Sequence, residues 1–190
     1  MLILLLFSFL CGSIPFAYII SRVFYGIDIR TQGSGNPGAT NVWRVVGKKP
    51  AAATFALDVL KGLAPVMAAK KYFPDMNLVV PIASGFCAVA GHVWSPFLKF
   101  RGGKGVATGF GVFLGLAPIP AALSVAVFCL FLFLTKLVAV GSMAAAVSLP
   151  IFLYLFDAHK NIIAISAVLA VIVIWRHKQN IKNIIDKKYD

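Results

Sequence analysis

The sequence predicts an all-α integral membrane protein with about seven transmembrane helices. Of its 190 residues, 60% are hydrophobic and 13% are charged, and the mean hydropathy is +0.90. Soluble domains are about 45–50% apolar and about 25% charged, so a soluble globule of this length could not bury so many apolar side chains. The apolar residues come in long blocks and do not alternate, which favours spanning helices over a β-barrel.

The first three spans are predicted at residues 2–20, 51–69 and 77–98. The first contains nineteen uncharged residues, enough to cross the hydrocarbon layer. We interpret it as one retained helix and not as a signal peptide, because no basic segment precedes it. A polar stretch rich in Gly and Asn separates the first span from the second, and a short loop with Lys70 and Lys71 precedes the third.

Four further helices are predicted in the C-terminal half. The uncharged run 106–135 is too long for one helix, and Pro118 and Pro120 predict a break because proline has no amide hydrogen and constrains the preceding residue. The helix before this break is short for a span unless the bilayer thins around it. The three later helices are predicted at residues 121–135, 137–156 and 161–175.

The distribution of basic residues predicts the orientation in the membrane. If the helices alternate, fourteen of the 18 Lys and Arg residues fall on one side. The positive-inside rule then places the N-terminus outside and the C-terminus in the cytoplasm. We therefore expect one transmembrane domain, residues 1–190, with its active-site loops on the cytoplasmic face at residues 22–50, 91–108 and 176–190.

The charge balance narrows the class of ligand. Six Asp and no Glu face the 18 basic residues, giving a net charge of +12. Such an excess favours anionic membrane lipid or an anionic substrate, and the chain has no long soluble basic segment that would suit nucleic acid. The three cysteines lie in apolar runs without metal or redox spacing, so the sequence predicts no metal site and no cofactor.

The first polar motif covers residues 33–44. Its glycines at 33, 35 and 38 permit a positive φ, and Arg44 would share a helical face with Thr40 if a helix begins near Pro37. Side-chain donors come from Ser34, Asn36, Thr40 and Asn41. The pattern suits an anion cradle, and it suits a polar loop followed by a capped helix equally well.

The second motif lies inside a predicted span. A charge in the middle of a span costs about 2.5–3.5 kcal/mol on insertion scales, so Asp58 and Lys61 should face a partner or a wet cavity. Their spacing of three residues lets them form a structural ion pair. The other interpretation places Lys61 against an anion in an aqueous cleft, with Asp58 positioning it.

The third motif, residues 91–108, is the most specific. Glycines at 102, 103 and 105 would let backbone amides converge on an anion beside Lys104, and the helix predicted from Val106 would point its positive end there. A nucleotide-binding P-loop is excluded because it needs glycine at 98 and Ser or Thr at 105. His92 and Thr108 are the other candidate phosphate-binding residues of this segment. A purely structural turn is the alternative.

The fourth motif follows the last span. His177 and Asn180 would lie on one face of a continuing helix. A basic tail that binds lipid headgroups explains the same residues. Ser142, near the cytoplasmic end of the sixth helix, is a further candidate for substrate binding, although small residues also serve helix packing.

Several enzyme classes lack their signatures here. No Asp follows a His by five residues, and neither G-x-S-x-G nor H-E-x-x-H occurs. The predicted cytoplasmic face therefore combines many anion-binding groups with no acidic residue placed to act as a base.

Four motifs together resemble the bacterial membrane acyl-phosphate:glycerol-3-phosphate acyltransferases. GHVWSPFLKFRGGKGVAT (91–108) matches the family pattern G-H-x4-F-x2-F-x-G-G-K-G-V-A-T at every specified position. SGNPGATNVWR (34–44), D-x-x-K-G (58–62) and R-H-x-x-N-I (176–181) resemble the family as well. The chain departs from the pattern in its tail, where relatives often carry a Glu.

This resemblance implies a multi-pass enzyme of the bacterial inner membrane. It would transfer a fatty acyl group from acyl phosphate to glycerol 3-phosphate, forming 1-acyl-glycerol 3-phosphate (lysophosphatidic acid) and phosphate for phospholipid synthesis. The enzyme that produces acyl phosphate would be its functional partner. The residues expected to be catalytic are Ser34, Arg44, Lys104, His177 and Asn180. Those expected to bind phosphate or substrate are Asn36, Thr40, Asn41, Lys61, His92, Gly102, Gly103, Gly105, Thr108 and Ser142.

Two other functions are compatible with parts of the sequence. A transporter for an organic phosphate would explain the helices and the cations. It would not explain why the polar motifs gather on one predicted face, since a translocation path should continue to the other side. A lipid-binding scaffold would have no use for the glycine-rich loop.

Overall fold

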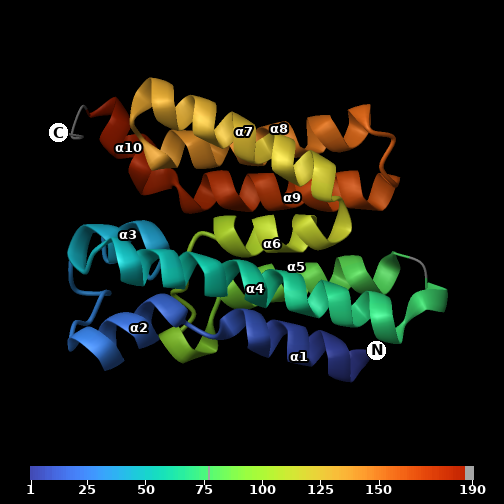
Figure 1. Cartoon of the computed structure of the whole chain (residues 1–190), viewed down its shortest axis with the longest axis horizontal. Coiled ribbons are helices and arrows are strands. Elements are labelled where there is room, and N and C mark those ends of the chain that lie inside the picture. Colours follow the sequence, from blue (N-terminus) through green and yellow to red (C-terminus); the bar gives the residue numbers. More distant parts are fainter. Residues whose placement is uncertain (77, 187–190) are drawn as a thin grey trace. The chain divides into compact units, whose positions relative to one another are not determined.

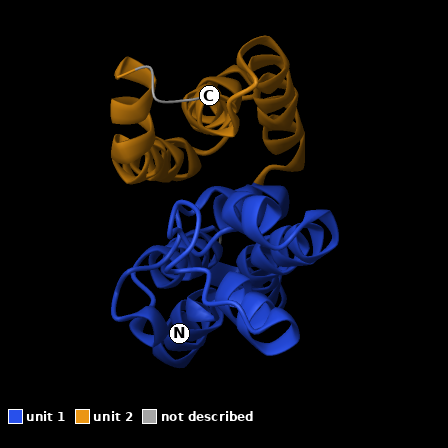
Figure 2. Cartoon of the chain, turned by 90° about the vertical axis from the view of Figure 1, so that its left-hand side faces the viewer, with its two compact units in different colours: residues 1–116 blue, residues 117–190 orange. Residues whose placement is uncertain are grey.

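The computed structural model describes residues 1–76 and 78–186, and every regular element within these ranges is helical. Residue 77, where the third span was predicted to begin, and residues 187–190 of the predicted tail lie outside the described residues. The chain forms two compact units, residues 1–116 and 117–190, which are described separately (Figure 2). The prediction of an all-α protein is confirmed, and the prediction of one transmembrane domain stays a prediction.

The described part of unit 1, residues 1–76 and 78–116, contains six α-helices (Figure 1). They are α1 (Leu2–Ser13), α2 (Phe16–Tyr25), α3 (Ala39–Val45), α4 (Lys48–Tyr72), α5 (Val79–Val93) and α6 (Val106–Leu116), with 3₁₀ turns at Pro74–Met76 and Pro96–Leu98. Helix α1 packs against α5, and α4 packs against both α5 and α6. The polar segments between α2 and α3 and between α5 and α6 connect these packed helices.

The first predicted span is not one helix. Helices α1 and α2 are bent by 44° at Ile14 and Pro15, so the prediction of a single helix over 2–20 is wrong. Pro15 has no amide hydrogen to continue α1, and it holds Ile14 in an extended conformation with ψ of 119°. The break leaves polar backbone groups in the interior of unit 1.

Among the described residues, length and composition identify four helices able to cross a membrane, or up to six if each of two bent pairs is one span. The four are α4, the segment Val79–Leu98 that includes α5, and two helices of unit 2, α7 (Pro118–Thr135) and α8 (Val138–Leu155). Helix α6 has 11 residues and belongs to the shorter apolar helices, as its predicted length suggested. These four to six candidate spans are compatible with a multi-pass membrane protein, and the count of seven stays a prediction.

Unit 2 continues with α9 (Lys160–Arg176) and α10 (Lys178–Ile185). The predicted break before Pro118 is confirmed, because α6 ends at Leu116 and α7 starts at Pro118. The last predicted span, 161–175, corresponds to α9, and the tail that follows forms α10, which is bent by 53° from α9 at His177.

Glycines bring the helices of unit 1 into backbone contact. A Cβ on Gly12 of α1 would collide with the backbone of Ala88 in α5, and one on Gly91 would collide with the carbonyl oxygen of Phe9. Helices α4 and α6 approach in the same way, because a Cβ on Gly111 would meet the carbonyl oxygen of Val59. This close approach places α5 against α1 and α6 against α4, and the loop between α5 and α6 carries Lys104.

We expect Gly111→Ala to destabilise the protein by about 1–3 kcal/mol, because the added methyl group forces α4 and α6 apart. Gly109→Ala in the same helix is the matched control. No described atom outside its own helix lies within 4 Å of the point that a Cβ on Gly109 would occupy, and alanine is the better helix former. Thermal unfolding in detergent measures both, and equal melting temperatures for the two variants would contradict the packing argument.

Candidate active site

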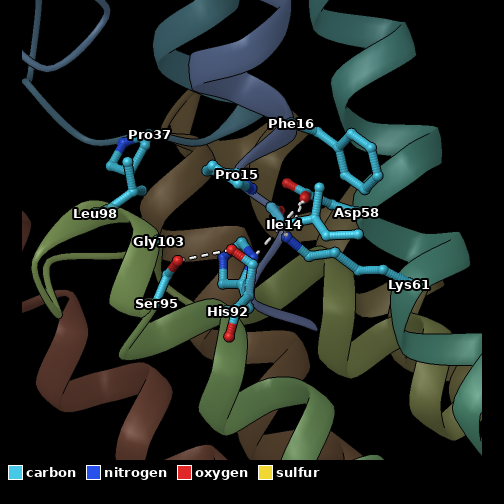
Figure 3. Close-up of a pocket in the computed structure, with 11 residues that line it drawn as sticks. Ile14, Pro15, Phe16, Pro37, Asp58, Lys61, His92, Ser95, Leu98 and Gly103 are labelled. Carbon is cyan, nitrogen blue, oxygen red and sulfur yellow. Dashed lines mark hydrogen bonds and ion pairs between the residues drawn. The ribbon is translucent and has the colours of Figure 1, made fainter. Parts of the chain in front are cut away.

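Four segments of unit 1 meet at a small polar pocket (Figure 3). They are the break between α1 and α2, the loop before α3, the middle of α4, and the end of α5 with the loop that follows. The lining residues are Ser13, Ile14, Pro15, Phe16, Pro37, Asp58, Lys61, His92, Ser95, Leu98 and Gly103. The structure thus brings parts of the first three polar motifs together.

A buried ion pair lies at this pocket. The Lys61 Nζ atom is 2.7 Å from Asp58 Oδ1, and the two side chains are 4% and 3% exposed. The same ammonium group donates a hydrogen bond of 2.8 Å to the Ile14 carbonyl at the helix break. Of the two interpretations of this motif, the contacts support the structural ion pair.

His92 connects the ion pair to the glycine-rich loop. Its Nδ1 atom lies 3.8 Å from Asp58 Oδ1, and its carbonyl oxygen accepts a 3.1 Å hydrogen bond from the Gly103 amide. The Gly102 amide likewise donates to Val93, at 3.1 Å. These two amides bond within the fold, and anion binding by Gly102 and Gly103 stays a prediction. A Cβ on Gly102 would collide with the His92 carbonyl oxygen and one on Gly103 with the imidazole Nε2 atom, so both positions require glycine.

The rest of this loop leads directly into α6. Gly105 has a φ of +84°, and its carbonyl accepts the first helical hydrogen bond, from Gly109. Half-buried Lys104 precedes it, so the lysine lies beside the amides of the first turn of α6. Thr108 is fully buried, and its hydroxyl has no hydrogen-bond partner among the described residues. The positive end of a helix and a cation are therefore adjacent, as predicted.

Asn41 organises the loop before α3. Its Oδ1 atom accepts a 2.9 Å hydrogen bond from the Ser34 amide, and its Nδ2 group donates to the carbonyls of Ile29 and Gln32 at 3.1 and 3.0 Å. The side chain is buried inside the loop. Phosphate binding by Asn41 stays a prediction, while its contacts indicate that it shapes the loop around Ser34.

The cation and hydroxyl predicted beside this loop share α3. Thr40 and Arg44 are both exposed and stand four residues apart in the helix, as expected. Gly33 and Gly35 have positive φ of 59° and 67°, whereas Gly38 is extended at −141°, so a positive φ is required at two of the three glycines. Exposed Ser34 and half-buried Asn36 complete the loop.

A second ion pair outside the spans supports the start of this loop. Arg30 bonds Asp28 through its Nη2 and Nε atoms at 2.6 and 2.9 Å. These bonds lower the pKa of Asp28 from 3.8 to about 2. The folded state is thus favoured by this pair above about pH 4, and the contribution is lost as the pH falls toward 2.

Three of the predicted site residues, His177, Ser142 and Asn180, belong to unit 2. His177 is 2% exposed, and its Nδ1 atom lies 2.8 Å from the Val173 carbonyl. A carbonyl can only accept, so Nδ1 carries the proton in this contact. Ser142 is buried and donates to the Val138 carbonyl of its own helix, and half-buried Asn180 lies in the first turn of α10.

The comparisons with known proteins agree with the motifs. A sequence profile described as glycerol-3-phosphate acyltransferase matches residues 2–187. The chain is 41% identical to the glycerol-3-phosphate acyltransferase of Endomicrobium trichonymphae over 183 residues, which is 96% of this chain and 91% of that protein. Identity to the enzyme of Synechococcus sp. (strain CC9902) is also 41%, covering 97% of this chain and 91% of that protein.

The chain belongs to the glycerol-3-phosphate acyltransferase family. The crystal structure of PlsY (YgiH), an integral membrane glycerol 3-phosphate acyltransferase in its glycerol 3-phosphate form, superposes with a TM-score of 0.94. That protein is 36% identical, and the match covers 100% of this chain and 94% of that one. Membership confirms the enzyme class and the multi-pass membrane location expected from the resemblance, and the relatives are bacterial.

The sequence argument missed two features of the site. Ser95 is buried and donates a 2.7 Å hydrogen bond to the Ser13 carbonyl, which joins the end of α5 to the end of α1. Its position before Pro96 signals a turn, but nothing signals a partner 82 residues away. The helix break at Pro15 was also missed, although a proline inside an apolar run is its ordinary signal.

We expect Asn41→Ala to loosen the loop before α3, because it leaves the Ser34 amide and two carbonyls without their partner. The cost should be about 1–3 kcal/mol, as for other lost buried hydrogen bonds. Thermal unfolding and limited proteolysis in detergent, with cleavage mapped within residues 28–38, measure the effect. Gln32→Ala is the control, because its side chain is exposed in the same loop. Equal cleavage of both variants would show that Asn41 does not organise the loop.

Proposed function

We propose that this enzyme transfers a fatty acyl group from acyl phosphate to glycerol 3-phosphate. The observation that carries the proposal is the convergence of two glycine-rich, cation-bearing segments, 33–44 and 102–105, beside one polar pocket of a strongly apolar chain. The solved PlsY structures, in a glycerol 3-phosphate form and a lysophosphatidic acid form, support the acceptor and the product. Both proposed substrates carry phosphate, which suits the excess of cations.

The reaction needs few groups from the protein. A hydroxyl oxygen of glycerol 3-phosphate attacks the acyl carbonyl carbon, the bond from that carbon to the phosphate oxygen breaks, and phosphate leaves. A phosphate oxygen takes the hydroxyl proton, so no side chain has to act as a base. Arg44 and Lys104, with the amides at the start of α6, offset the charge of the two phosphates. The protein's main contribution is to hold the two substrates in line.

The remaining predicted residues take supporting roles in this proposal. Ser34, with Asn36 and Thr40, orients the acceptor or the acyl carbonyl oxygen, and Gly105 allows a phosphate to approach the backbone. In unit 2 the roles of His177, Asn180 and Ser142 rest on the sequence motif. For His177 we propose a contact that orients the substrate.

We further propose seven membrane segments with the N-terminus outside and the C-terminus in the cytoplasm. The support is the predicted placement of fourteen of 18 basic residues on one side. The loops with Ser34 and Lys104 then face the cytoplasm of a bacterial cell, at its inner membrane. There they can meet soluble glycerol 3-phosphate and acyl phosphate delivered by the enzyme that makes it.

With purified protein and labelled glycerol 3-phosphate, we expect lysophosphatidic acid from acyl phosphate and none from acyl-CoA. Lys104→Ala should lower kcat/KM at least about 100-fold, since it removes a charge that stabilises the departing phosphate. Lys160→Ala, which removes a cation from the opposite predicted face, is the control. Product from acyl-CoA at a comparable rate would overturn the donor assignment. Transport of glycerol 3-phosphate into proteoliposomes without any product would overturn the enzyme function.

Proton transfer to a substrate phosphate makes a separate prediction. His177→Ala should retain turnover within about 10-fold of the parent, whereas Arg44→Ala should lose about 100-fold or more, because only the arginine offsets developing charge. The pH dependence of kcat separates the alternatives. A limb of the pH profile that vanishes in His177→Ala and persists in Arg44→Ala would identify the histidine as a general base.

A further inference from the structure

We propose that Asp58 and Lys61 are positioning residues for this reaction, and that neither binds a substrate phosphate. The pair sets the relative placement of the α1–α2 break, the loop before α3 and the Gly102–Gly105 loop. This inference rests on the proposed acyl transfer, and it assigns Lys61 a role different from the phosphate binding expected from its motif.

The contacts of Lys61 point into the protein. Its ammonium group has three N–H donors, of which one faces Asp58 Oδ1 at 2.7 Å and another the Ile14 carbonyl at 2.8 Å. Its Nζ atom also lies 5.5 Å from the ring centroid of Phe16. A carboxylate at this distance cancels most of the attraction that a buried ammonium would exert on a phosphate. Lys61 is therefore a poor phosphate ligand and a good anchor.

The anchor holds the break between α1 and α2. In a continuous helix the Ile14 carbonyl would accept a hydrogen bond from the amide four residues later. It cannot do so here, because the helix is broken at Pro15. It accepts from the Phe16 amide at 3.1 Å and from Lys61, which lies 47 residues away on α4. The long-range bond fixes the direction of α2, and α2 leads into the loop with Ser34. Pro37 of that loop lines the same pocket (Figure 3).

The Asp58 carboxylate faces the second segment, the glycine-rich loop, through His92. Asp58 Oδ1 faces His92 Nδ1 at 3.8 Å, and the His92 carbonyl holds the Gly103 amide. A Cβ on Gly103 would collide with the imidazole Nε2 atom, so the ring lies directly against the backbone that precedes Lys104. A shift of His92 therefore shifts the loop. Lys61 thus bonds to the break that leads into one cation-bearing segment, and its partner Asp58 lies against the histidine whose backbone bonds the other.

Three variants separate positioning from phosphate binding. Asp58→Asn and Lys61→Met each leave one buried charge without its partner, which is strongly destabilising. The double variant Asp58→Asn/Lys61→Met has neither charge, and replacing a whole buried pair is tolerated far better. The decision rests on the double variant, measured as purified full-length protein in detergent with acyl phosphate and labelled glycerol 3-phosphate.

We expect the double variant to lose about 10- to 100-fold in kcat, because small displacements of substrate-holding groups cost this much. The KM for glycerol 3-phosphate should stay within about 3-fold of the parent, since its ligands remain. The loss should be no greater than that of the more impaired single variant that folds, as for residues that act as one unit. Lys104→Met, which removes a proposed phosphate ligand, should raise that KM by more than 10-fold.

Lys70→Met is the matched structural control. Lys70 belongs to the same helix and donates a 2.6 Å hydrogen bond to the Gly115 carbonyl of α6, away from the pocket. We expect it to change stability and leave kcat and KM within about 2-fold. A double variant with parental kcat would overturn the positioning role. A KM raised as in Lys104→Met would make Lys61 a phosphate ligand, and absence of turnover in the parent would instead refute the proposed donor or reaction.

Discussion

The site in unit 1 depends on hydrogen bonds to the backbone carbonyls that are left free where α1 ends among apolar helices. No water is available in the hydrocarbon layer, so a helix that stops there needs a donor from another segment for its last carbonyls. Lys61 supplies that donor to Ile14, and Asp58 Oδ1 lies 2.7 Å from the same ammonium group. Pairing offsets part of the cost of about 2.5–3.5 kcal/mol that each charge would carry alone in a span. Because the break is satisfied in this way, α1 can end at Ser13 and make room for polar loops at the pocket.

Close helix packing determines how accurately those loops are placed. Gly12 and Gly91 allow α1 and α5 to meet backbone to backbone, and Gly111 does the same for α6 against α4. Contacts of this kind tolerate little sliding, because any larger side chain would separate the helices. The amides of Gly102 and Gly103 then tie the loop to the last turn of α5. Lys104 consequently projects from a backbone held at both ends, by α5 on one side and by α6 on the other.

Much of this arrangement could be predicted from local sequence. The hydrogen bonds between residues far apart in the sequence could not. Blocks of apolar residues predicted the helices, and Pro118 predicted the boundary between α6 and α7. The motif around Lys104 predicted a cation at a helix start, and the ion pair of Asp58 and Lys61 was one of two interpretations that their spacing allowed. The bonds from Lys61 to Ile14 and from Ser95 to Ser13 could not be predicted, since they join residues 47 and 82 positions apart without any pattern in between. The bend at Pro15 escaped prediction because a run of uncharged residues does not by itself define a straight helix.

The scarcity of acidic residues has a physical reason in the proposed reaction. A carboxylate beside two phosphates would repel both the substrates and the departing phosphate, so free acids near the site would raise the barrier. Among the described residues, Asp28 is held by Arg30 and Asp58 by Lys61, so two of the chain's six acids are paired in unit 1. These two carboxylates are held by their own cationic partners, which limits their repulsion of phosphate. An acyl phosphate is already an activated donor, so it needs charge compensation and alignment more than a base. A buried aspartate that aligns backbone segments and contacts no substrate is compatible with such chemistry, whereas an exposed glutamate at the same loops would oppose it.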